Sequence, residues 1–140
     1  MRRFVRSFVL CAVLFAGFSI GLAAQAQSAD EAKAEKEFYE SVEREIERLT
    51  RLLDLNDAQV FFVDSIIVHD YKAMQAEIKE LSERKVSNAN MYYDVQDKWQ
   101  ESIYEAYEKL FDEDQWAKYL KSGAARDKKS RDKRRAKAQR

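Results

Sequence analysis

The sequence predicts an all-α protein, and three observations support this prediction. The 140 residues contain no proline and only three glycines, so few positions interrupt a helix. Charged residues make up 36% of the chain and recur every three or four positions, as on a solvated helix surface. Apolar residues also recur at helical spacing, and β-branched runs are few. We expect three to four amphipathic helices in an antiparallel hairpin or small bundle, followed by a disordered basic C-terminal tail.

The first 26 residues are expected to form a secretory signal peptide. Arginines make the N-terminus positive, and an apolar run follows from Phe8 to Ala24. A small-x-small pattern ends at Ala26, so we expect cleavage there, with Ala29 as the second candidate. The alternative is an uncleaved anchor, because the run approaches the ~18 residues that span a bilayer. Cys11 is the only cysteine and lies in this run, so the mature chain would contain no thiol.

Four helices are predicted within an expected helical domain at residues 30–121. The break between the second and third helices rests on a turn-like cluster at residues 87–90. Because neither proline nor glycine enforces this turn, one continuous helix remains the alternative. The four predicted helices span approximately residues 30–53, 57–81, 87–110 and 113–121.

The zero net charge of the chain conceals a strong asymmetry. Residues 30–120 contain 23 acidic and 12 basic side chains, whereas residues 121–140 contain 10 basic and two acidic ones. Beyond Gly123 the only apolar residues are alanines, which bury too little surface to offset the entropy of ordering a chain. We therefore expect residues 122–140 to be a disordered basic tail, either solvated or in weak contact with anionic components of the cell envelope.

Two short segments of the sequence resemble each other and have the chemistry of helix starts. In each, an Asn or Asp can cap the helix, and a Gln three residues later can reach back to the cap amide. An apolar residue precedes each cap and can pack on the first turn. The six residues of this motif are Leu55, Asn56 and Gln59 in the first copy and Phe111, Asp112 and Gln115 in the second.

The repeated motif resembles the Leu-Thr-x-x-Gln motif of the Spy/CpxP-like periplasmic proteins. Asn56 and Asp112 replace the threonine, and Phe111 replaces the leucine of the second copy. The resemblance covers approximately residues 38–120. It implies a curved helical hairpin that pairs into a cradle-shaped homodimer. It also implies a role in envelope stress, as an ATP-independent chaperone or as a regulator of a membrane stress sensor.

The second and third predicted helices carry more apolar surface than one packing stripe requires. Such widened faces indicate burial on two sides, by other helices of the chain, by a dimer partner or by an unfolded client protein. Tyrosine suits a surface that is alternately wet and covered. The residues of this predicted client or dimer face are Phe61, Phe62, Ile66, Tyr93, Tyr104 and Tyr107.

The sequence does not predict an enzyme, a cofactor or a metal site. His69 is the only histidine, and His69-Asp70 lacks the further histidines of metal phosphohydrolases. No pair of carboxylates has the pattern of a general acid and base, and no glycine-rich phosphate loop is present. Export also excludes nucleic acid as a partner of the tail. We expect a periplasmic, chaperone-like holder of unfolded envelope proteins or an envelope-stress modulator. A structural or adaptor protein without chaperone activity is the alternative.

Overall fold

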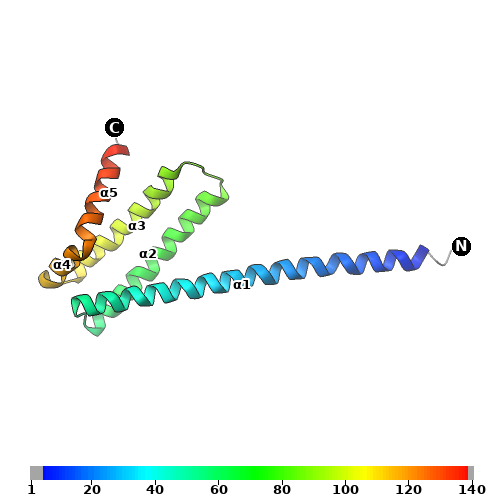
Figure 1. The fold of residues 1–140 in the computed structure, drawn as a ribbon, viewed down its shortest axis with the longest axis horizontal. Coiled ribbons are helices and arrows are strands. Elements are labelled where there is room, and N and C mark those ends of the chain that lie inside the picture. Colours follow the sequence, from blue (N-terminus) through cyan, green and yellow to red (C-terminus); the bar gives the residue numbers. More distant parts are fainter. Residues whose placement is uncertain (1–4, 139–140) are drawn as a thin grey trace. The chain divides into compact units, whose positions relative to one another are not determined.

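The computed structural model describes the backbone of residues 5–138 and the side chains of residues 29–138. The described residues contain helices and no strand, which confirms the predicted all-α class. The predicted signal peptide lies outside the residues whose side chains are described. No described helix is both long enough and apolar enough to cross a membrane. The elements are α1 (Val5–Leu53), α2 (Asp57–Glu83), α3 (Ala89–Leu110), α4 (Glu113–Tyr119), the π-helical turn η1 (Leu120–Ala124) and α5 (Ala125–Ala138) (Figure 1).

The chain divides into two compact units, Met1–Ser41 and Val42–Arg140. Exposed (i, i+4) ion pairs link Lys33 to Glu37 and Lys36 to Glu40 within the first unit, and each such pair stabilises a helix by ~0.3–0.5 kcal/mol. The second unit contains the last turns of α1 and all later elements. Its most buried side chains are Leu49, Leu53, Val63 and Ile67.

Helices α2 and α3 pack against each other in opposite directions. Gln59, at the start of α2, donates to the carbonyl oxygen of Leu110 at the end of α3. Further along, Glu77 of α2 accepts hydrogen bonds from Lys98 and Trp99 of α3. The start of α2 therefore lies beside the end of α3.

The break between α2 and α3 is real, so the alternative of one continuous helix is wrong. The amide of Val86 donates to the carbonyl oxygen of Leu81, and that of Lys85 donates to the carbonyl oxygen of Ser82. Lys85 has a φ of 53°, in the left-handed region. This is the Schellman arrangement, which usually places glycine at the left-handed position.

Helix α1 ends in the same way, with a left-handed residue and a backbone hydrogen bond that spans the last turn. Asp54 has a φ of 56°, and the amide of Leu55 donates to the carbonyl oxygen of Thr50. A left-handed residue without glycine costs ~1–2 kcal/mol, and the surrounding packing must offset this cost.

The prediction of a disordered tail is wrong for the described residues, because Ala125–Ala138 forms helix α5. Its cations pair with carboxylates of α3, so charge pairing compensates for its lack of apolar burial. Gly123, with a φ of 124°, lies in η1 and makes the bend between α4 and α5. This left-handed backbone is open to glycine without steric cost.

Candidate functional site

Both predicted capping motifs form complete capping boxes. The Asn56 side chain accepts from the Gln59 amide at 2.9 Å, and the Gln59 side chain accepts from the Asn56 amide at 3.2 Å. The corresponding distances for Asp112 and Gln115 are 2.8 and 3.1 Å. Each box satisfies two amides at a helix start, so α2 and α4 begin where the motif predicts.

The two boxes are joined in space by their glutamines. Gln59 Nε2 donates to Gln115 Oε1 at 2.7 Å, and Gln115 Nε2 donates to Gln59 Oε1 at 3.0 Å. Gln115 is buried, and Gln59 is half-buried. The two motifs lie 56 positions apart in the chain, and the two glutamines bring them into contact. We call this glutamine pair the polar joint; it lies where α2 and α4 begin and α3 ends. The sequence predicts each cap but not this joint.

The structure separates the six residues of the predicted client or dimer face. Phe61 and Phe62 are 66% and 51% exposed, and their rings contact each other edge to face with centroids 5.7 Å apart. Tyr93 is 53% exposed. Ile66 and Tyr104 are half-buried. Tyr107 is only 3% exposed, so its assignment to an exposed face is wrong.

Tyr107 is instead part of an aromatic cluster at the end of α3. Its ring lies 5.0 Å from that of Phe111 and 5.5 Å from that of Tyr119. Burial raises the pKa of Tyr119 to about 12, and it also raises the pKa of Tyr107. The cluster holds α4 against α3, and it extends through Trp116 to Tyr104.

Phe62 and Ile66 line a shallow groove between α2 and α3. The groove has a volume of about 480 Å³, and Ala106 and Leu110 form its apolar wall on α3. Glu105 and Lys109 provide charge on the same side. Tyr93 lines a different hollow, with Arg134 and Lys137 of α5. Of the six residues of the predicted face, Phe61, Phe62 and Ile66 therefore share one apolar surface at this groove.

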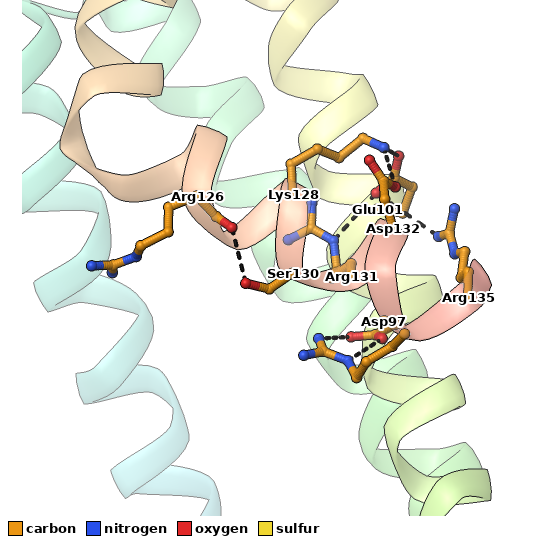
Figure 2. Close-up of polar contacts among 9 residues, drawn as sticks. Asp97, Glu101, Arg126, Lys128, Ser130, Arg131, Asp132 and Arg135 are labelled. Atoms are coloured by element: carbon orange, nitrogen blue, oxygen red, sulfur yellow. Dashed lines mark hydrogen bonds and ion pairs between the residues drawn. The ribbon is translucent and has the colours of Figure 1, made fainter. Parts of the chain in front are cut away.

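The predicted basic tail is ordered by ion pairs with α3. Arg134 forms two hydrogen bonds with Asp97, at 2.6 and 2.7 Å. Arg131 donates to Glu101 at 3.2 Å, and Lys128 pairs with the same carboxylate at 3.0 Å (Figure 2). Asp97 and Arg131 are each only 6% exposed.

Sequence reasoning missed these five residues of α3 and α5 that meet across the interface. The signal available was spacing, because Asp97 and Glu101 are four residues apart and therefore share one face of a helix. Lys128, Arg131 and Arg135 have the (i, i+3, i+7) spacing of a matching cationic stripe.

Nδ1 of His69 lies 2.7 Å from Oδ1 of the buried Asp70 carboxylate, which accepts the hydrogen bond in the tautomer with a proton on Nδ1. The His69 ring also contacts Trp99 edge to face. The imidazole itself is largely exposed. Within the part of the chain that the structure describes, no group of three or more His, Cys, Asp and Glu side chains is arranged to hold a metal ion.

Comparison of the chain with protein-family models, with curated proteins and with solved structures found no match.

Proposed function

We propose that this chain is an exported helical binding protein that holds unfolded envelope proteins in the periplasm. The exposed aromatic pair Phe61–Phe62 beside the α2–α3 groove is the observation that carries the proposal. Half-exposed aromatic rings next to an apolar groove lose their contact with water when an unfolded segment covers them. No catalytic residue and no cofactor form part of this proposal.

Export and family membership belong to the same proposal. The basic N-terminus, the apolar run and the small residues before Ala26 support a cleaved signal peptide. The two capping boxes, at the positions of the Leu-Thr-x-x-Gln motif, support membership in the Spy/CpxP-like family. By this resemblance the helices form a hairpin or small bundle, the protein pairs as a homodimer, and a membrane stress sensor is a further partner.

The proposal predicts that the chain suppresses aggregation of an unfolded client at equimolar concentration. The client is reduced α-lactalbumin, and light scattering measures its aggregation. A Phe61→Ala/Phe62→Ala variant should bind the client about thirtyfold more weakly, since each half-covered ring contributes roughly 1 kcal/mol. Because both side chains are already exposed, the variant should retain its fold.

Tyr93→Ala is the matched control, because Tyr93 is similarly exposed but lies away from the groove. Equal losses in the two variants would show that general surface hydrophobicity, and not the groove, holds the client. Wild-type protein without any effect on scattering would refute the holder activity and leave a structural or adaptor role.

A further inference from the structure

Helix α5 has two cationic faces with different environments. The inner face contacts α3, where Asp97 and Glu101 neutralise Arg134, Arg131 and Lys128 (Figure 2). Cation–π contacts add to this docking, because Lys128 and Arg131 also lie over the ring of Tyr104 at 6.0 and 5.6 Å. The inner face is thus occupied by the chain itself.

The outer face carries a row of lysines. Lys129, Lys133 and Lys137 follow one another at intervals of four residues, and all three are exposed. Since an α-helix rises 1.5 Å per residue, consecutive members of the row are separated by roughly 6 Å along the helix axis. None of the three forms an ion pair with another described side chain. The cations of the row are therefore not neutralised by a described carboxylate, and Lys137 at its end also borders the hollow that Tyr93 and Arg134 line.

The chemistry of this row suits a diffuse anionic surface. Lysine is a hydrated point charge without the planar fork that recognises one carboxylate or phosphate in a fixed geometry. The arginines of α5 that do form such specific pairs, Arg131 and Arg134, contact α3 instead. Helix α5 contains no aromatic residue on which a nucleic-acid base could stack, and no large apolar residue that could insert between acyl chains.

We propose that the outer face of α5, through Lys129, Lys133 and Lys137, binds the anionic headgroup surface of a lipid bilayer. The contact is peripheral and electrostatic, so it weakens with salt. Docking of α5 on α3 holds the lysines in one row and removes the inner cations from the contact. This inference is independent of the proposed holder activity, because it uses neither Phe61–Phe62 nor the groove.

The test is sedimentation with lipid vesicles. The chain is expressed from its full sequence and purified in the form that cells yield, with its N-terminus identified by mass spectrometry. Binding is compared between vesicles of phosphatidylcholine alone and vesicles with phosphatidylglycerol. The ratio of the two affinities is the measured quantity, and it is compared among proteins that share the same N-terminus, so that any retained basic and apolar N-terminal segment contributes equally to each. Circular dichroism verifies that each variant remains helical.

A Lys129→Gln/Lys133→Gln/Lys137→Gln variant should reduce the preference for anionic vesicles by on the order of 100-fold, since each surface lysine contributes roughly fivefold. The matched control, Lys72→Gln/Lys79→Gln/Lys118→Gln, removes the same charge from exposed positions on α2 and α4 and should retain most of the preference. In 0.5 M NaCl the wild-type preference should largely disappear.

Three results would overturn the proposal. The first is a wild-type chain that binds both vesicle types equally. The second is an equal loss in the two lysine variants, which would make net charge alone responsible. The third is a duplex DNA oligonucleotide that displaces the chain from anionic vesicles at equal phosphate concentration, which would identify a nucleic acid as the better partner.

Discussion

The reciprocal amide pair between Gln59 and Gln115 should couple the starts of α2 and α4 energetically. Gln59→Ala removes both hydrogen bonds of the pair and the bond from the Asn56 amide, and it deprives the buried Gln115 amide of a partner. Because a typical intramolecular hydrogen bond contributes a net ~1 kcal/mol, we expect a loss of about 2–3 kcal/mol in unfolding free energy. Gln115→Ala should cost a similar amount.

The double variant should cost less than the sum of the two single variants. The pair accounts for two bonds that either substitution removes, so the coupling energy should be about 1–2 kcal/mol. Urea unfolding followed by helical circular dichroism measures all four free energies. For a folded unit of this size, each single substitution should also lower the melting temperature by roughly 10 °C.

Two controls separate the joint from the caps. Gln59→Glu can still accept from the Asn56 amide but cannot donate to Gln115 Oε1 or to the Leu110 carbonyl oxygen, so it keeps the cap and removes the bonds that Gln59 donates. Gln75→Ala, at an exposed position of α2, should change stability by less than about 0.5 kcal/mol. A coupling energy within 0.5 kcal/mol of zero would refute the reasoning, because the two boxes would then act as separate caps.

Three further predictions concern α5, the aromatic cluster and the turn between α2 and α3. Asp97→Asn should weaken the docking of α5 by about 1–2 kcal/mol, because the Asp97–Arg134 pair joins a buried carboxylate to a half-exposed guanidinium. Amide hydrogen exchange in α5 should then accelerate about tenfold, and an unchanged exchange rate would contradict this prediction. Burial raises the pKa of Tyr119 to about 12. Because a Tyr in the unfolded chain titrates near pH ~10, the stability that the buried neutral phenol contributes is complete below pH ~10 and is lost as pH rises towards 12. Tyr119→Phe should flatten this alkaline decline in thermal melts. Lys85→Gly should relieve the left-handed backbone and stabilise the fold by about 0.5–1 kcal/mol in the same melts, whereas destabilisation would show that the lysine side chain contributes more than its strain costs.

Sequence alone predicts the helix class and the starts of α2 and α4 because capping is local. The residues that form each capping box are three positions apart, so their chemistry can be read without knowledge of the fold. The ends of α1 and α2 are different. Asp54 and Lys85 adopt left-handed backbone conformations without glycine, and the packing that enforces them lies elsewhere in the chain.

Order in the tail could not be predicted from the tail's own composition. Residues 125–138 bury almost no apolar surface, and the partner of Arg131 is Glu101, which lies 30 positions earlier. Tyr107 was misplaced for a related reason. Its helical position is compatible with either of two faces, and only the aromatic neighbours Phe111 and Tyr119 determine which face is covered.

Helix α3 is held on two sides by interactions of different kinds. Towards α2 it contributes Ala106 and Leu110, which lie beside Phe62 and Ile66 of α2 in an apolar contact that added sodium chloride does not screen. Towards α5 it contributes Asp97 and Glu101, whose attraction to arginine and lysine falls as ionic strength rises. High concentrations of sodium chloride should therefore undock α5 from α3 while α2 and α3 stay packed against each other. Salt alone would then separate the C-terminal helix from the rest of the fold without denaturing the α2–α3 pair.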